Sequence, residues 1–213
     1  MSLEKYKYIV VEGPIGAGKT SLARKLAEHL QADLVLEGAE ANPFLPKFYQ
    51  DMARYALATQ LFFLFQRVEQ VRDLKQTDLF GRPIVSDFIL DKDPLFAQLT
   101  LSDDEFRLYQ QIYAQLEPQT PTPDLVIYLQ APTDVLVERV RQRGVSHERP
   151  IDEHYLARLA DSYTRYFYQY EASPLMIVNS ENLNFVDEPK DFELLVQRIE
   201  AMRGGREFFN RGE

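Results

Sequence analysis

The stretch YIVVEGPIGAGKTSLARKLAEHL, residues 8–30, decides the fold of this chain. It begins with a continuous β-branched run, which is typical of a strand buried on both faces of a parallel sheet. Glycines then interrupt the run, and from residue 18 a helix is expected, because Leu22, Leu26 and Leu30 are spaced four apart. A strand, a glycine-rich loop and a helix in this order are typical of a phosphate-binding site.

Residues 13–20, GPIGAGKT, match the pattern G-x-x-x-x-G-K-[ST] without a mismatch. Glycines allow consecutive backbone N–H groups to turn toward a phosphate, Lys19 adds a positive charge, and the hydroxyl of Thr20 is a ligand for Mg²⁺. A glycine turn with a chance lysine is the alternative, but the strand before and the helix after favour the functional interpretation. We therefore expect Mg²⁺·ATP to bind here. The predicted ATP-binding residues are Gly13, Pro14, Ile15, Gly16, Ala17, Gly18, Lys19 and Thr20.

Composition narrows the class of protein. Of the 213 residues, 45% are hydrophobic and 27% are charged, as in ordinary globular proteins. The formal net charge of −9 argues against a nucleic-acid partner, because phosphate backbones attract clustered Lys and Arg. The absence of cysteine excludes disulfides and thiolate metal sites, and no apolar stretch is long enough for a signal segment or a membrane span. A cytoplasmic enzyme that acts on small molecules is the expectation.

The rest of the chain alternates between strand and helix patterns. Strands are expected at residues 32–38, 82–88, 124–131 and 174–180, and helices at 46–75, 102–116, 133–144, 151–172 and 190–202. This alternation predicts a single α/β domain over residues 1–213, with a parallel central sheet between two layers of helices. Residues 204–213 fit no element, and we expect them to be disordered.

Acidic side chains follow two of the expected strands. In a parallel sheet the carboxyl ends of the strands converge on the phosphate-binding crevice. Glu37 at the end of the second strand could accept the proton of an attacking hydroxyl, and Asp87 at the end of the third could hold Mg²⁺. A solvated strand-end acid remains the alternative for Glu37. Asp93, which precedes Pro94, could equally serve the site or begin a helix.

A combination of motifs resembles a known family. GPIGAGKTS, the pattern E-x-x-x-x-NPF that begins at Glu37, and a long helix carrying Gln60 and Arg67 are similar to the deoxyribonucleoside kinases, most of all the bacterial deoxyadenosine/deoxyguanosine kinases. The resemblance extends from Tyr8 to about Asn179. It implies a P-loop kinase fold with a helical lid, transfer of a phosphoryl group from ATP to the sugar 5′-hydroxyl, and a homodimer packed through long helices.

The resemblance also assigns roles to individual residues. Glu37 matches the catalytic base, and Gln60 matches the amide that pairs with the nucleobase. Arg67 and Asp93 match an ion pair that lies behind the nucleobase. Tyr49 and Glu148 match residues that contact the sugar 3′-hydroxyl. Beyond the phosphate loop, the expected substrate-binding residues are therefore Glu37, Tyr49, Gln60, Arg67, Asp93 and Glu148.

The segment ERVRQRGVSHERP resembles the kinase lid, here residues 139–150. Arg139 and Arg143 lie four apart on one helix face, and we expect both to converge on the phosphates and stabilise charge in the transition state, as Lys19 does. A solvated helix end, whose arginines complement the helix dipole, is the alternative.

Two positions depart from the family pattern. Phe88 stands where the family usually has an arginine after the strand-end acid, and Lys92 is a candidate substitute. Val145 stands where many members have another lid arginine, with Arg149 as a candidate replacement. Both departures concern the groups around the transferred phosphoryl group.

The hypothesis from sequence is a deoxynucleoside kinase for purines, deoxyadenosine or deoxyguanosine, with deoxycytidine as a further substrate. A nucleoside monophosphate kinase similar to thymidylate kinase is the first alternative, but residues 37–46 contain no Arg or Lys to hold the acceptor phosphate. A non-catalytic nucleotide switch is the second, and it would leave Glu37, Gln60 and Arg67 without a role. The choice between ATP and GTP as donor stays open.

Overall fold

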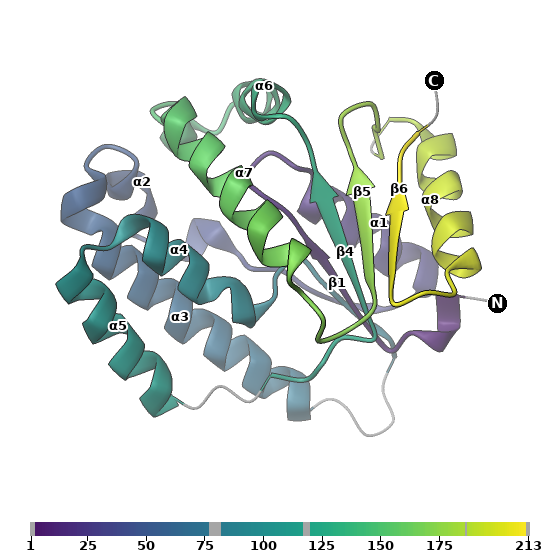
Figure 1. The fold of residues 1–213 in the computed structure, drawn as a ribbon, viewed down its shortest axis with the longest axis horizontal. Coiled ribbons are helices and arrows are strands. Elements are labelled where there is room, and N and C mark those ends of the chain that lie inside the picture. The colour runs from purple at the N-terminus through teal and green to yellow at the C-terminus, as the bar shows by residue number, and fades with distance from the viewer. Residues whose placement is uncertain (1–2, 77–81, 117–119, 186, 212–213) are drawn as a thin grey trace.

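The computed structural model describes residues 3–76, 82–116, 120–185 and 187–211. Its centre is one sheet of six strands, in the order β2-β3-β1-β4-β5-β6, in which every neighbouring pair is parallel (Figure 1). The strands are β1 Tyr8–Glu12, β2 Asp33–Val35, β3 Ile84–Ser86, β4 Leu125–Gln130, β5 Leu175–Asn179 and β6 Arg206–Phe209. The prediction of a parallel α/β architecture is confirmed.

Helices cover both faces of the sheet. The α-helices are α1 Lys19–Leu30, α2 Leu45–Phe48, α3 Met52–Gln76, α4 Asp93–Thr100, α5 Asp103–Leu116, α6 Thr133–Arg143, α7 Glu153–Tyr168 and α8 Pro189–Ala201. Short 3-10 turns are η1 Leu3–Lys5, η2 Ala39–Ala41, η3 Leu90–Lys92 and η4 Ser146–Glu148. In Figure 1, α7 crosses in front of the sheet, α1 lies behind it, and α3, α4 and α5 form a group at one side.

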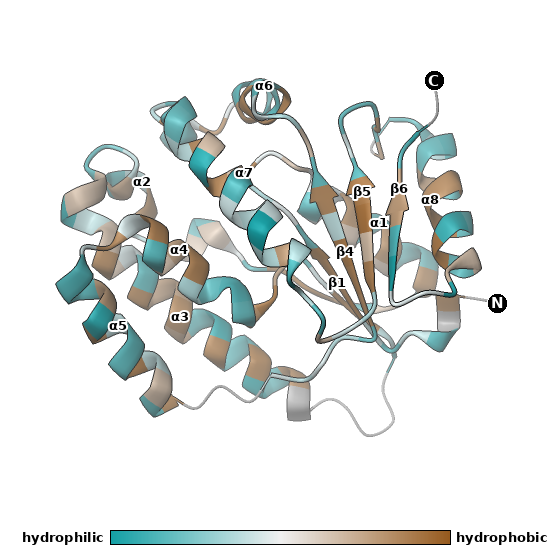
Figure 2. Cartoon of the chain, viewed as in Figure 1, coloured by the Kyte–Doolittle hydropathy of each residue, from teal (hydrophilic) through white to brown (hydrophobic). Residues whose placement is uncertain are grey.

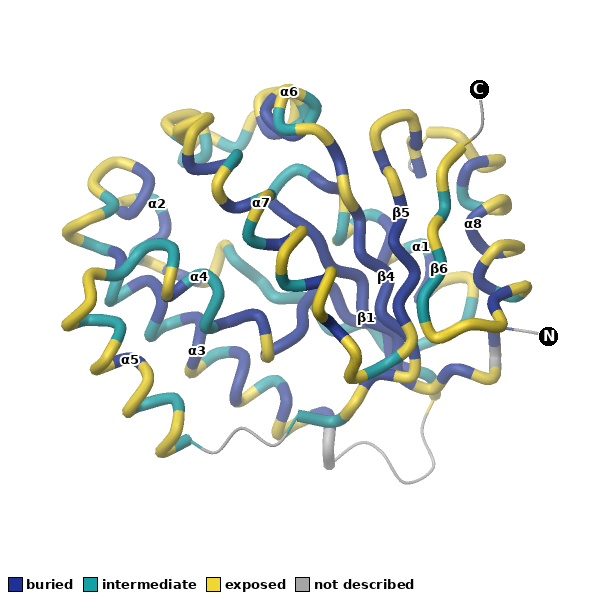
Figure 3. Tube along the Cα trace, viewed as in Figure 1, coloured by how far each residue is buried: buried dark blue, intermediate teal, exposed yellow. Residues whose placement is uncertain are grey.

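The alternating side chains of β1 explain the layers. Ile9 and Val11 pack with residues of α1 and α8 in one buried cluster, whereas Tyr8 and Val10 pack with α3 and α7 in a second. The central strands are hydrophobic and buried, while the outer helix faces are polar and exposed (Figures 2 and 3). No helix in the described parts of the chain is long and apolar enough to cross a bilayer.

The helix expected over residues 46–75 is divided in the structure. The short α2 ends at Phe48, and α3 begins at Met52, where the side chain of Asp51 accepts a hydrogen bond from the backbone N–H of Arg54. The break gives Tyr49 a place at the joint rather than on a continuous helix face. Asp93 begins α4 with Pro94 in its first turn, so the alternative in which this dipeptide starts a helix is correct as a description of local structure.

The prediction that the tail is disordered was wrong for residues 206–209. Residues 206–209 form β6, which pairs in parallel with β5 from Leu175↔Arg206 onward. The guanidinium of Arg206 also donates to the backbone oxygens of Tyr168 and Tyr170. The free edge of β5 provides backbone partners that a short aromatic segment can use, which the composition of the tail does not reveal. Residues 212–213 lie outside the described residues.

Candidate active site

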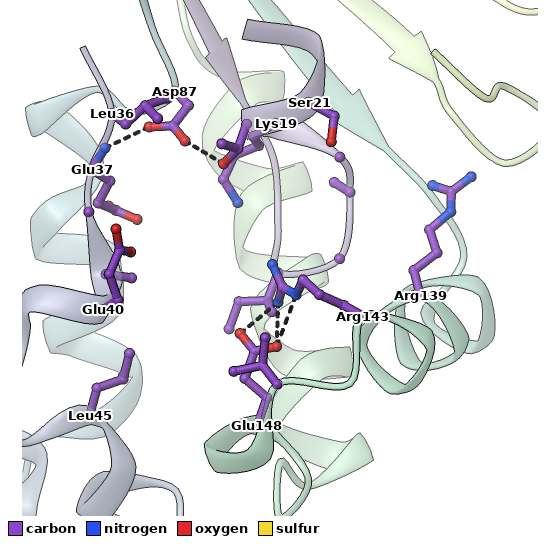
Figure 4. A pocket seen from close by; sticks show the side chains of 18 of the residues that line it. Lys19, Ser21, Leu36, Glu37, Glu40, Leu45, Asp87, Arg139, Arg143 and Glu148 are labelled. Carbon is purple, nitrogen blue, oxygen red and sulfur yellow. Dashed lines mark hydrogen bonds and ion pairs between the residues drawn. The ribbon is translucent and has the colours of Figure 1, made fainter. Parts of the chain in front are cut away.

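A cavity of about 970 Å³ opens at the carboxyl ends of the strands. Its walls come from the phosphate loop, residues 36–40, α2 and α3, the lid segment and residues 181–185. Figure 4 shows this cavity, with Glu37 and Glu40 on one side and the lid residues Arg143 and Glu148 opposite. Its place agrees with the rule that ligands of parallel sheets bind beyond the carboxyl ends of the strands.

The phosphate loop has the backbone that its glycines predict. Gly16 has φ +87°, and a Cβ atom there would lie 2.7 Å from the carbonyl oxygen of Leu136, so this position requires glycine. The ammonium of Lys19 donates to the carbonyl of Pro14 at 3.2 Å and therefore lies over the loop. Burial and repulsion from Lys92 lower the pKa of Lys19.

Asp87 connects the phosphate loop to the strand that carries Glu37. Its Oδ2 accepts a hydrogen bond from the hydroxyl of Thr20 at 2.5 Å, and its Oδ1 accepts one from the backbone N–H of Glu37 at 2.7 Å (Figure 4). Two hard oxygen groups thus meet beside Lys19, where a nucleotide's phosphates would lie. Mg²⁺ commonly takes one or two protein oxygens together with phosphates and water, so Thr20 and Asp87 fit this ion.

A buried network of ion pairs and hydrogen bonds connects Glu37, Arg67, Asp93 and Tyr109. The guanidinium of Arg67, only 3% exposed, donates from Nε and Nη2 to Oε1 of Glu37 and from Nη1 to Oδ2 of Asp93. Asp93 is fully buried, and its Oδ1 accepts a 2.5 Å hydrogen bond from the hydroxyl of Tyr109. Arg67 therefore links Glu37 to Asp93, which lies behind the guanidinium and does not line the cavity.

The environment keeps Glu37 ionised. Burial alone would raise the pKa of this carboxyl, but the positive charges of Arg67, Lys92 and Lys19 outweigh burial and hold its pKa well below the usual 4.5. An ionised Glu37 can accept a hydrogen bond from a substrate hydroxyl without first losing a proton.

Gln60 and Tyr49 also line the cavity. The amide nitrogen of Gln60 donates to the hydroxyl of Thr100 at 3.3 Å, whereas its amide oxygen is buried with no hydrogen-bond partner among the described residues. Because Gln60 lines the cavity, this oxygen can accept a hydrogen bond from a ligand. The ring of Tyr49 stacks on His147 of the lid segment at 6.4 Å between centroids, and burial raises the pKa of Tyr49 well above 10.

The two lid arginines take different directions. Arg143 forms an ion pair with Glu148, donating from Nε and Nη2 to its carboxylate, and both residues face the cavity (Figure 4). Arg139 instead donates to the backbone oxygens of Ser180, Glu181 and Leu183. The structure does not bring the guanidinium groups of Arg139 and Arg143 together, because the loop after β5 offers Arg139 three carbonyl acceptors. Arg139 still borders the cavity, at the loop after β5.

The two departures from the family pattern have different structural outcomes. The ring of Phe88 is fully buried in an apolar cluster with residues of α3 and α5, away from the cavity walls. Lys92 lines the cavity, and its Nζ lies 3.4 Å from Oε1 of Glu37. Val145 borders the cavity, whereas Arg149 does not and instead borders a second cavity of about 270 Å³.

Three further polar residues of the site were missed from sequence. Glu12, fully buried at the end of β1, contacts Lys92 and the first N–H of the phosphate loop. Gln66 donates to the backbone oxygens of Glu37 and Gly38, and Tyr163 donates to Glu12. A charged residue that ends an otherwise apolar strand, as Glu12 does, is the signal that could have indicated a buried partner.

A family model described as deoxynucleoside kinase matches residues 9–202. This chain belongs to the deoxynucleoside kinase family. It is 33% identical over 200 residues to a deoxyguanosine kinase of Bacillus subtilis, covering 92% of this chain and 97% of that protein. It is 35% identical over 192 residues to a deoxyadenosine kinase of Lactobacillus acidophilus, covering 84% of this chain and 87% of the relative.

A solved deoxynucleoside kinase has the same fold. The deoxyadenosine kinase of M. mycoides, described with the products dCMP and a flexible dCDP bound, superimposes with a TM-score of 0.79 at 25% identity, covering 92% of this chain and all of that one. This chain is therefore an enzyme with the P-loop kinase fold that phosphorylates deoxynucleosides.

Proposed function

We propose that the chain transfers the γ-phosphoryl group of Mg²⁺·ATP to the 5′-hydroxyl of a purine deoxyribonucleoside, in nucleotide salvage. The observation that carries this proposal is the position of Glu37, which stands between the phosphate loop and the Arg67–Asp93 pair. A nucleoside with its sugar at Glu37 and its base toward Gln60 and Arg67 would direct its 5′-hydroxyl to the phosphate loop.

Each residue then has a task in phosphoryl transfer. The N–H groups of residues 13–20 and Lys19 hold the phosphates, Glu37 accepts the hydrogen bond of the attacking hydroxyl, and Arg143 leaves Glu148 to approach the transferred group. Tyr49 and Glu148 hold the 3′-hydroxyl. Arg139, tied to residues 180–183, shapes the wall on which the donor nucleotide lies. Such a reaction depends on positioning and on charge stabilisation.

Thr20 and Asp87 are the residues that would hold Mg²⁺. When bound, the ion would neutralise charge on the β- and γ-phosphates. The hydrogen bond from Thr20 to Asp87 keeps both oxygen groups together, and the bond from the N–H of Glu37 to Asp87 ties the proposed base to the same point.

The hydrogen-bonding groups of the pocket suit a purine. Gln60 offers a donor and an acceptor, and Arg67 has further N–H groups beyond those given to Glu37 and Asp93. Adenine and guanine both present paired acceptors or donors along their edges, and a side-chain amide and a guanidinium are the groups that read them. The relatives, named deoxyguanosine and deoxyadenosine kinases, support the same choice. The dCMP described with the M. mycoides enzyme supports deoxycytidine as a further substrate.

The monophosphate-kinase alternative is disfavoured. Its acceptor would bring a second phosphate to the wall formed by residues 36–40, where the side chains of Glu37 and Glu40 are acidic (Figure 4). Two carboxylates repel a phosphate dianion. A non-catalytic nucleotide switch would not need the buried ion pairs that join Glu37, Arg67 and Asp93.

The proposal is tested by measuring ADP formation from Mg²⁺·ATP with each of the four deoxynucleosides and, in parallel, with their 5′-monophosphates. We expect turnover with deoxyadenosine or deoxyguanosine, and a fall of at least about a hundredfold in kcat for Glu37→Gln with ATP binding intact. The isosteric Glu40→Gln on the same wall is the control and should retain activity. Turnover with monophosphates alone would overturn the proposal.

A homodimer and a cytoplasmic place of action complete the proposal. Phe65 on α3 and Leu108 on α5 are large apolar side chains that are 48% and 46% exposed, and neither borders the cavity. An interface between subunits through these helices would cover both side chains. The cytoplasm supplies the ATP that the reaction requires.

A further inference from the structure

Lys92 is a buried cation to which the phosphoryl transfer described above assigns no contact with either substrate. Its side chain is 1% exposed, and its Nζ lies 2.7 Å from Oε1 of Glu12 and 3.4 Å from Oε1 of Glu37. Placing an ammonium in the interior is costly unless it is paired with a carboxylate. Lys92 has two carboxylates within reach, one structural and one at the proposed reaction centre.

Glu12 is a fixed anchor for this ammonium. Its Oε2 accepts hydrogen bonds from the N–H of Gly13 at 3.0 Å and from the hydroxyl of Tyr163 at 3.2 Å. Its Oε1 accepts one from the N–H of Ile89 at 2.9 Å, besides the contact with Lys92. Glu12 is thus held by the phosphate loop, by α7 and by the segment before η3, and it cannot move without disturbing all three.

The contacts of Glu37 are concentrated on one oxygen. Oε1 receives Nε and Nη2 of Arg67 and lies near Nζ of Lys92, whereas no hydrogen bond reaches Oε2 among the described residues. The side chain of Glu37 is 18% exposed and borders the cavity. Two cations from different elements therefore hold Oε1, and Oε2 remains for a ligand.

We propose that Lys92, anchored by Glu12, is a positioning residue that fixes the carboxylate of Glu37 so that its free oxygen receives the 5′-hydroxyl. This inference rests on the proposed function of Glu37. Arg67 approaches from α3 and Lys92 from η3, so the carboxylate is fixed by two directions rather than one. Through Glu12, the same arrangement ties the position of the base to Gly13, the first residue of the phosphate loop.

The competing explanation is that Lys92 only neutralises Glu12. Removing Lys92 alone cannot separate the two, because an unpaired Glu12 would itself destabilise the fold. The double variant Glu12→Gln/Lys92→Met removes both charges of the pair and leaves no lone buried charge. A second double variant, Glu12→Gln/Lys92→Gln, keeps polar contact between the two positions while still removing the cation from Glu37.

The measurements are kcat, KM for the deoxynucleoside and the thermal midpoint for both double variants. Each double variant is also combined with Glu37→Gln, which gives a mutant cycle that measures the coupling between the Glu12–Lys92 pair and Glu37. We expect both double variants to fold, kcat to fall by about tenfold or more, and KM to change by less than about threefold. On the Glu37→Gln background the same changes should cost almost nothing further, because the carboxylate that Lys92 positions is gone. Lys190→Met, at an exposed position of α8, is the control and should leave every quantity unchanged.

The outcomes separate the two levels of the argument. A wild-type kcat in the two double variants, or an equal loss with and without Glu37, would overturn the role of Lys92 while the proposed function stands. A wild-type chain that transfers phosphate to no deoxynucleoside would overturn the proposed function itself. If one double variant fails to fold, the other still carries the comparison, and loss of folding in both would show that Lys92 is structural.

Discussion

At the scale of single residues, Gln60 offers the clearest test of base recognition. Its buried amide oxygen has no donor in the structure, so the stability of the free enzyme gains little from it. Gln60→Ala should therefore raise Kd for the deoxynucleoside by about tenfold or more and leave the affinity for ATP unchanged. Titration calorimetry with each ligand measures both.

The control for Gln60→Ala is Gln111→Ala, at an exposed position of α5, which should change neither affinity. If Gln60→Ala keeps its nucleoside affinity, then the amide does not read the base and the pocket assignment is wrong. A parallel loss of affinity for both ligands would instead indicate damage to the whole cavity.

Residue roles could be predicted from sequence where a motif ties them to backbone geometry. Residues 13–20 could be predicted in this way, because the loop requires glycine at Gly16. The ion pair of Arg67 with Asp93 was only implied by resemblance, and the structure places the two together. The contact of Arg67 with Glu37 was not predicted. Arg139 could not be predicted, because two arginines four apart share a helix face but choose different acceptors across a loop.

At the scale of elements, the start of α5 is held by a pair of residues three apart in the sequence. The carboxylate of Glu105 accepts hydrogen bonds from the backbone N–H and the hydroxyl of Ser102, and the bond from the N–H is the one that the glutamate of a capping box makes. Ser102→Ala should lower the free energy of unfolding by about 1 kcal/mol, measured by denaturant unfolding.

Glu105→Gln is the matched control for the cap. Glutamine keeps an acceptor for the N–H of Ser102, so the loss should be smaller than for Ser102→Ala. Equal losses for both variants would contradict the capping explanation and indicate an effect of charge at the helix start.

The elements that sequence did not predict were set by long-range contacts. The division into α2 and α3 is an exception, because the cap at Asp51 is a local bond to Arg54. By contrast, the first residue of the short helix α4 is held by Arg67 and Tyr109. Lys92 reaches Glu12 from the 3-10 turn η3, a conformation that hydrophobic periodicity does not signal. Such contacts between distant segments are invisible to local patterns.

At the scale of the whole molecule, buried tyrosines make the folded state less stable at alkaline pH. Burial raises the pKa of Tyr8 and of Tyr128 from 10.0 to about 12. A raised pKa means that folding favours the neutral phenol, so this stability is fully present below about pH 10 and is lost as the pH rises toward about 12. Denaturant unfolding at a series of pH values should show a steady loss of stability above about pH 10, of about 1 kcal/mol per pH unit for each such tyrosine.

Ultraviolet absorbance of tyrosinate provides the check on that pH dependence. Ionisation of the buried tyrosines should coincide with unfolding followed by circular dichroism. Full ionisation near pH 10 in a molecule that stays folded would contradict the raised pKa values.

The proposed homodimer is also tested at this scale. Phe65→Glu/Leu108→Glu places charge at two exposed apolar positions, one on α3 and one on α5, and it should shift the sedimentation equilibrium from dimer toward monomer. Phe208→Glu, on the 62% exposed ring of β6, is the control and should leave the mass unchanged. If the unmodified chain is already a monomer, the proposal of a homodimer is wrong.

The pairing of β6 with β5 has a consequence for synthesis on the ribosome. β5 leaves the ribosome well before β6, because the whole of α8 lies between them in the chain. During that interval its apolar strand, buried in the finished molecule, presents a bare edge to other nascent chains. We therefore expect the nascent chain to be most prone to aggregation between the synthesis of β5 and the pairing of β6, the strand of four residues that covers this edge.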